Sequence, residues 1–218
     1  QPLLTPLVLD MTSADVLGYL GSVIGIGMLL GTLIMSAWGG PRRKVHGVLG
    51  FLMLGGLFTS MLGLRPSLPL MALGGFLMMI TFPIVNGSSQ AIWQRKVALD
   101  VQGRVFSTRR MIAWSTTPIA FALAGPLADQ VFKPLLLEGG ALADSVGQLI
   151  GVGPGRGVGL MIVIIGLCNI VAAGAGYLSP RVFHVEDELP DAVQSEEGGI
   201  DLMQNLAETA TSAPGLND

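Results

Sequence analysis

The residues with the clearest capacity for chemistry form a basic turn. Arg42, Arg43 and Lys44 stand in SAWGGPRRKVHG, residues 36–47, and long apolar stretches lie on both sides of it. Consecutive cations bind phosphate groups and nucleic acids, but they also mark the cytoplasmic turns between membrane-spanning helices. The elements that flank the turn decide between these two interpretations.

A second charged group lies in VALDVQGRVFSTRR, where Asp100 and Arg104 are accompanied by Arg109 and Arg110. Asp100 and Arg104 have opposite charges at helical spacing, which favours an ion pair. Two interpretations remain open for them. They form a gate that latches in one state of a moving protein, or they are basic anchoring at a membrane surface with Asp100 an incidental partner.

Residues typical of catalysis or metal binding are scarce. The chain has two histidines, His46 and His184, which are far apart in sequence, and its one cysteine, Cys168, lies in an apolar run. The glycines of GVGPGRGVG, residues 151–159, resemble a phosphate-binding loop, but no strand precedes them and no Lys-Ser or Lys-Thr pair follows. The sequence therefore predicts no enzyme, no metal site and no cofactor.

The composition indicates a membrane protein. Half of the 218 residues are hydrophobic and only 12% are charged, against roughly 25% charged in soluble domains. The acids are concentrated at the end of the chain, where nine of the 15 lie within residues 186–218. We expect a transmembrane region over residues 1–180 and an acidic, disordered tail over residues 181–218.

Five stretches are long and apolar enough to cross the hydrocarbon core, which takes about 20 helical residues. They are residues 16–38, 45–64, 67–93, 105–128 and 157–178. We interpret residues 1–10 as the end of a further span that is truncated. The sequence therefore predicts an all-α, polytopic transmembrane helix bundle.

The basic residues predict its orientation. With the turn at residues 42–44 inside, nine of the 12 basic residues share its side, namely Arg42, Arg43, Lys44, Arg95, Lys96, Arg104, Arg109, Arg110 and Arg181. The other side holds Arg65, Lys133 and Arg156. This positive-inside pattern predicts a plasma (inner) membrane protein with a cytoplasmic C-terminus, and it assigns the turn to a membrane surface instead of nucleic acid.

Polar side chains inside the spans predict a cavity, because polar groups at membrane depth face protein or enclosed water. The expected cavity residues are Asn86, Gln90, Trp114, Thr116, Thr117 and Asn169. They would hydrogen-bond and stack with a mainly apolar small molecule. No Asp, Glu, Lys or Arg stands in the middle of a complete span, so we expect a proton relay to lie outside these residues.

The fourth span contains two prolines. Pro118 and the Gly125-Pro126 pair each interrupt backbone hydrogen bonding, and we predict a helix kink there. A bent helix is typical of transporters that flex about a central site.

The chain resembles a known family. QAIWQRKVALDVQGRVFSTRRMIAWSTTPIAFALAGPLADQVF, residues 90–132, resembles the tenth-to-eleventh helix region of exporters of the major facilitator superfamily, in the macrolide-efflux-like branch. VQGRVFS followed by AGPLAD is its most specific part, and LGYLGSVIGIGMLLGTLIMSAWGGPRRKVHG, residues 17–47, resembles the eighth helix and the loop after it. The resemblance covers about residues 3–190 and implies a C-terminal half, with helices eight to twelve and the end of seven.

This resemblance implies twelve helices in two halves around a cavity, alternating access, and proton-driven efflux of amphipathic compounds. The implied partners are the lipid bilayer, the missing N-terminal six-helix half, a small-molecule substrate and protons. The family's inner loop reads Gly-x-x-x-Asp-Arg-x-Gly-Arg-Arg/Lys, and the copy here keeps Gly40 and the bases at residues 42–44. Ala37 and Trp38 stand where Asp-Arg would fall, so the loop lacks its carboxylate. Gly125-Pro126 resembles the family's Gly-Pro motif, with Phe121 in place of the preceding glycine.

The sequence thus predicts a major facilitator efflux transporter, with an inner gate formed by Arg42, Arg43, Lys44, Asp100 and Arg104. Two alternatives remain. One is an uptake symporter of the same fold, and the other is a non-transporting membrane anchor or assembly subunit.

Overall fold

The computed structural model describes residues 14–65, 67–137, 139–153, 155–188 and 192. Throughout these residues the chain is built from helices and connecting turns, without β-strands. The predicted all-α helix bundle is confirmed. The truncated span expected at residues 1–10 lies outside the described residues.

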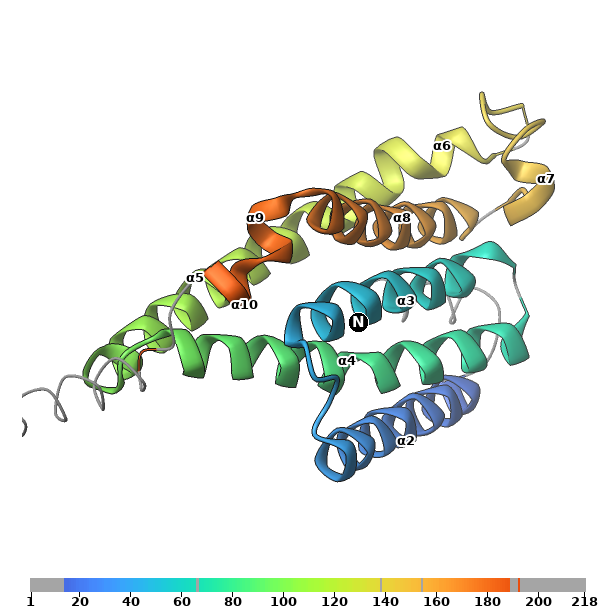
Figure 1. The fold of residues 1–218 in the computed structure, drawn as a ribbon. Helices are drawn as coiled ribbons and strands as arrows, with labels where there is room; N and C mark the ends of the chain where they lie inside the picture. Colours follow the sequence, from blue (N-terminus) through green and yellow to red (C-terminus); the bar gives the residue numbers. More distant parts are fainter. Residues whose placement is uncertain (1–13, 66, 138, 154, 189–191, 193–218) are drawn as a thin grey trace, which may run out of the picture.

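Five long helical segments form the body of the molecule (Figure 1). They are α2 (Ala14–Trp38), α3 (Lys44–Leu64), α4 (Leu68–Lys96), α5 (Leu99–Pro126) with its continuations η1 (Leu127–Phe132) and α6 (Lys133–Leu135), and α8 (Arg156–Leu178). The short helices are α7 (Gly147–Ile150), α9 (Pro180–Phe183) and α10 (Val185–Glu188). Each of the five long segments is long and apolar enough to cross a membrane.

Local signals explain the turn between α2 and α3. Gly39 and Gly40 have φ angles of 71° and 78°, a left-handed conformation that glycine adopts without steric cost. The N–H of Gly39 donates a 2.8 Å hydrogen bond to the carbonyl oxygen of Met35, which closes the end of α2. Pro41 follows and cannot extend the helix.

The turn between α4 and α5 is shorter than the sequence suggested. α5 begins at Leu99 and not at residue 105, directly after the extended pair Val97–Ala98. The side-chain amide of Gln102 donates hydrogen bonds of 3.0 Å to the carbonyl oxygens of Gln94 and Val97. These bonds satisfy carbonyls at the end of α4, and they tie the two helices together at the turn.

Four helices pack in the order α2, α4, α3, α8 (Figure 1). Glycines line both outer contacts of this row. A Cβ atom at Gly31 of α2 would lie 2.5 Å from the carbonyl oxygen of Ile80 in α4, and one at Gly166 of α8 would lie 2.5 Å from that of Gly56 in α3. Glycine is therefore required for these backbones to approach so closely.

Helix α5 stands apart from this row. It leaves the end of α4, contacts α4 near the turn through Gln102 and Arg109, and packs on the bundle again where η1 meets α8 (Figure 1). Ala124 is the single buried residue of α5. The helix therefore borders open space along most of its length.

The predicted helix kink coincides with a change of helix type at one of the two prolines. Pro118 lies within regular α-helix, but after Pro126 the chain continues as the π-helix η1. Pro126 has no N–H to donate to the turn before it, and the N–H of Leu127 is shared between the carbonyl oxygens of Leu123 and Ala124. The kink itself stays a prediction.

The start of the acidic tail is ordered. Residues 180–183 and 185–188 form α9 and α10, which corrects the disorder expected from residue 181 onward. Contacts with α3 and α8 stabilise them, and such contacts cannot be read from local composition. Of the rest of the predicted tail, residues 189–191 and 193–218 lie outside the described residues.

Candidate functional site

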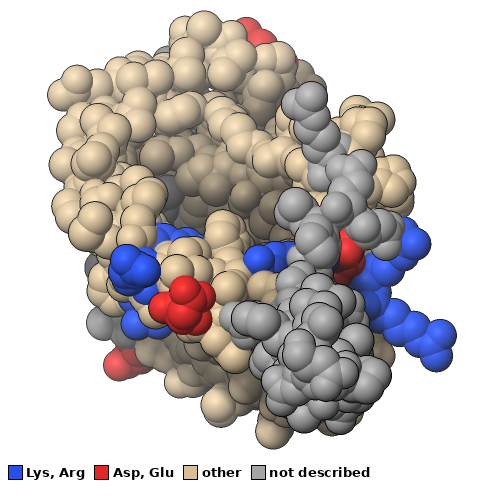
Figure 2. Space-filling view, turned by 60° about the vertical axis from the view of Figure 1, so that its left-hand side comes forward, with Lys and Arg blue, Asp and Glu red and all other residues tan. Residues whose placement is uncertain are grey.

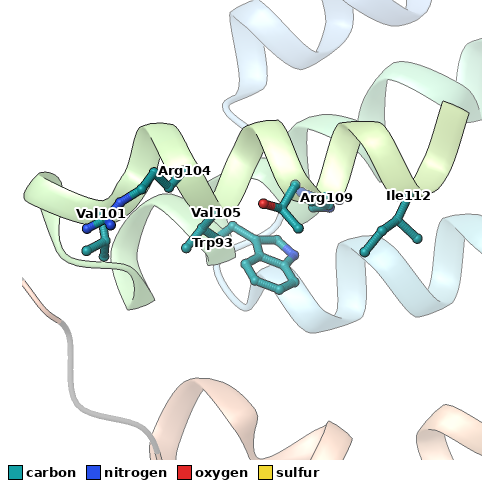
Figure 3. A pocket seen from close by; sticks show the side chains of 7 residues that line it. Trp93, Val101, Arg104, Val105, Arg109 and Ile112 are labelled. Carbon is teal, nitrogen blue, oxygen red and sulfur yellow. The ribbon is translucent and has the colours of Figure 1, made fainter. Parts of the chain in front are cut away.

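The diverging helices α4 and α5 enclose a groove close to the turn that joins them (Figure 3). Its volume is about 620 Å³, and its walls are Trp93 of α4 together with Val101, Arg104, Val105, Thr108, Arg109 and Ile112 of α5. We call it the α4–α5 groove. The residues of α5 recur at intervals of three or four, so they share one face of that helix.

Arg109 is the best-fixed polar side chain of the groove. Its Nη2 donates a 2.9 Å hydrogen bond to the hydroxyl oxygen of Ser89 on α4. Its guanidinium carbon lies 5.1 Å from the centre of the Trp93 ring, within the range of a cation–π contact. Arg109 is therefore half-buried and held by two residues of the opposite wall, whereas Arg104 is exposed.

The groove combines apolar walls with a few polar donors. Val101, Val105 and Ile112 provide aliphatic surface, and the indole of Trp93 provides a flat face. Ligand sites for small molecules have this character, with few polar groups that fix orientation. The arrangement can hold an amphipathic molecule whose polar end accepts hydrogen bonds from the guanidinium groups.

Basic side chains surround the same end of the molecule. Figure 2 shows Lys and Arg side chains gathered along the lower half of one face, with a hollow in the uncharged surface above them. The turn before α3 and the end of α4 meet there, because Lys44 and Lys96 both contact Glu186. Two of the loops that the sequence assigned to the inner side thus lie at one end of the bundle.

Three of the predicted cavity residues lie along the helix faces that form the groove. Asn86 and Gln90 are exposed on α4, at helical spacing from Trp93, and Thr116 follows Ile112 by one turn of α5. Asn86 Nδ2 donates a 2.9 Å hydrogen bond to the carbonyl oxygen of Phe82 within its own helix. These three residues are not among the residues that line the groove, but they lie on the same helix faces farther from the turn.

Trp114 lies elsewhere. It borders a second hollow of about 520 Å³, which is lined by Gly103, Phe106, Ser107, Arg110 and Met111. That hollow is on the other face of α5, because Trp114 is two residues from Ile112 and thus rotated by about half a turn. The structure does not bring Trp114 together with Asn86 and Gln90.

The last two predicted cavity residues are also displaced from the groove. Thr117 is exposed on α5 but turned away from the line of Ile112 and Thr116. Asn169 is half-buried where α8 meets α3, next to Gly56. The six predicted residues therefore do not form one site.

The predicted gate residues fall into two groups. Arg42 is exposed and Lys44 Nζ donates a 2.6 Å hydrogen bond to the carbonyl oxygen of Gly39, within the turn itself. Within the described residues, no ion pair of 4.0 Å or less joins Asp100 to Arg104. The gate stays a prediction for both groups, as it does for Arg43.

Sequence reasoning missed Glu186. One oxygen of its carboxylate accepts a 2.9 Å hydrogen bond from the N–H of Lys44, and the other accepts a 3.2 Å bond from the N–H of Val45. The helix α3 has no side-chain cap of its own, since Arg43 stands at the N-cap position. That missing cap is the one sequence signal for a distant carboxylate at this helix end.

Trp93 and Arg109 were also missed as site residues. Arg109 was counted only among the basic residues of the inner side, and Trp93 only as the last residue of the third apolar span. Over the described residues, no three His, Cys, Asp or Glu side chains are grouped to hold a metal ion.

Comparison with known proteins adds a weak but consistent similarity. Two curated proteins, both macrolide efflux protein A, come from Streptococcus pyogenes and from its serotype M6, and each is 26% identical to this chain over 113 residues. The matched segment is 48% of this chain and 26% of each relative, so the match spans about a quarter of the relatives' length. No protein-family model and no solved structure matches the chain.

Proposed function

We propose that the chain is part of a membrane transporter of the major facilitator type, which exports small amphipathic compounds by alternating access and is driven by protons. Five helices that are long and apolar enough to cross a membrane, together with the similarity to macrolide efflux protein A, support a membrane transporter. An uptake symporter would move its substrate into the cell instead of out of it, and a membrane anchor or assembly subunit would move no substrate.

The observation that carries this proposal is the α4–α5 groove. One long helix stands apart from four packed helices, and the space between them is apolar with a fixed guanidinium at its wall. Alternating access proceeds largely by rocking of one half of a transporter against the other, and α5, which is exposed along most of its length, offers a face to such a partner half.

Open helix faces support the expected second half. A Cβ atom at Gly18, Gly21 or Gly25 of α2 would meet nothing within 4 Å, so this small-residue face has room for another helix. We propose that the six-helix partner half packs against this face and against α5. The proton relay, which these residues lack, would then lie in that half.

The proposal is tested by the accumulation of a macrolide in bacterial cells whose own efflux pumps are deleted. Cells that express the full reading frame should accumulate less of it than cells with an empty vector. Arg109→Ala should restore accumulation, because it removes the groove's anchored cation. Arg110→Ala is the matched control, because Arg110 lines the other hollow.

The same assay separates the alternatives. An uptake symporter would raise accumulation above that of the empty vector, and an anchor or assembly subunit would leave it unchanged. Export is contradicted if either of these outcomes is found both with the macrolide and with an amphipathic dye.

A further inference from the structure

The segment after the last long helix folds back onto the end of the bundle that carries the basic turn. Glu186 of α10 bridges the first two free N–H groups of α3, those of Lys44 and Val45, at 2.9 and 3.2 Å. The first N–H groups of a helix lack partners within it and carry a partial positive charge. A carboxylate in this position makes charge-assisted hydrogen bonds, which are stronger than neutral ones.

A second contact ties the same segment to α4. Lys96 Nζ donates a 2.8 Å hydrogen bond to the backbone carbonyl oxygen of Glu186. The residue therefore joins the start of α3 through its side chain and the end of α4 through its backbone. Both anchors lie at one point of the segment.

An aromatic cluster provides the third contact. The Phe183 ring of α9 packs edge-on against His46 of α3 at 5.3 Å and lies 6.2 Å from Tyr177 of α8. The hydroxyl of Tyr177 is 3.5 Å from Nδ1 of His46. Phe183 thus fills a position between α3 and α8, independently of the carboxylate.

We infer that residues 180–188 form a latch, a segment that holds the ends of α3, α4 and α8 together and that opens when the Glu186 carboxylate leaves the start of α3. This one short segment contacts all three helices at this end, through the hydrogen bonds of Glu186 and through the aromatic ring of Phe183. When Glu186 leaves, the start of α3 loses the carboxylate that caps its first two N–H groups, and the Lys96 ammonium loses one of its partners, the carbonyl oxygen of Glu186. The latch is a property of the fold and does not depend on the transport proposed above.

The test follows the reactivity of a buried thiol at the start of α3. Val45 is only 4% exposed and stands beside the Glu186 contact, so Val45→Cys reports opening. Cys168, the only cysteine of the chain, is replaced by serine to leave a single reactive thiol. Labelling by a charged maleimide is followed in lipid nanodiscs, where both membrane faces are accessible.

Glu186→Gln should speed the labelling of this introduced thiol by about tenfold or more, which is the scale of losing a charge-assisted hydrogen bond. Asp144→Asn is the charge control, since it removes one carboxylate charge at an exposed position in the turn before α7, and it should label at the parent rate. Equal rates in both variants would overturn the latch.

Two further variants test the latch if Glu186→Gln does not fold. Glu186→Asp keeps the charge, but its side chain is one methylene shorter and brings the carboxylate less close to the two N–H groups of α3. This variant should label at an intermediate rate. Phe183→Ala should also speed labelling, because it removes the aromatic contact without a charge change. Parent-like labelling in both of these variants contradicts the proposal.

Discussion

Arg109 of α5 donates a 2.9 Å hydrogen bond to Ser89 of α4, so these helices are tied together at the groove from which they diverge. The same guanidinium lies over the ring of Trp93. Few other contacts hold α5 to α4, because α5 has a single buried residue, Ala124, near its other end. Together with the two hydrogen bonds of Gln102 at the turn, this connection holds the two walls of the α4–α5 groove.

Replacement of Arg109 by Lys should weaken that connection although the charge remains. Lysine lacks the planar group that stacks on an indole and donates at a fixed angle. Loss of the two contacts costs about 1–3 kcal/mol, and export should fall several-fold while Arg110→Lys exports normally. The check is thermal unfolding in detergent together with the cell accumulation assay. Unchanged stability and export in Arg109→Lys would show that the contact has no role.

Ser88 predicts a stabilising substitution. Its side chain is fully buried against Gly47, and within the described part of the chain its hydroxyl has no hydrogen-bond partner. Ser88→Ala removes an unsatisfied buried group and should gain about 1 kcal/mol.

Ser60→Ala is the matched comparison, because the Ser60 hydroxyl donates a 3.0 Å hydrogen bond to the carbonyl oxygen of Gly56. Its loss should cost about 0.5–1.5 kcal/mol. Unfolding temperatures of the two variants should therefore move in opposite directions from the parent, and a shift of Ser88→Ala to lower temperature refutes this account of the site.

The crossing of α3 and α8 predicts a glycine that tolerates no side chain. A Cβ at Gly166 would lie 2.5 Å from the carbonyl oxygen of Gly56 and would also meet Ser60, so Gly166→Ala should destabilise the chain by about 1–3 kcal/mol. Gly174 of the same helix has nothing within 4 Å, and Gly174→Ala should be neutral or stabilising by about 0.5–1 kcal/mol. Thermal unfolding compares the two, and equal effects would contradict the close approach of the backbones.

The separation of the predicted cavity residues has a functional consequence. Gln90 and Asn86 lie on the face of α4 that carries Trp93, beyond the residues that line the groove, whereas Trp114 borders the hollow on the other face of α5. Gln90→Ala and Asn86→Ala should each lower export of an amphipathic compound by several-fold, since a lost hydrogen bond is worth about 1 kcal/mol. Trp114→Ala should leave export close to the parent rate. Normal export in Gln90→Ala and Asn86→Ala would remove these residues from the substrate path.

The membrane-crossing helices followed from sequence because length and apolar composition are local properties. The end of α2 was equally clear, since Gly39, Gly40 and Pro41 each have a conformational reason to stop a helix. The start of α5 was placed too late, because Asp100 and Arg104 make its first turns polar and loop-like. These first turns are joined to the end of α4 by the hydrogen bonds of Gln102 and not by a buried apolar face.

The site was harder to predict because it depends on contacts between distant residues. Glu186 and Lys44 are 142 positions apart, and nothing in an acidic tail distinguishes the one carboxylate that caps a helix. Asn169 was grouped with Gln90 because both are polar within apolar spans, but the packing of α8 on α3 places it elsewhere. Helix pairing, which decides both cases, is not encoded in any single span.

The central claim of export is tested most directly in everted membrane vesicles that contain the full reading frame and are acidified inside. An exporter that exchanges protons should accumulate a labelled macrolide in these vesicles, and a protonophore should abolish that accumulation. Arg109→Ala should reduce it several-fold while Arg110→Ala preserves it. Vesicles that accumulate no more compound than those from empty-vector cells, or that lose it when they are acidified, would contradict the account.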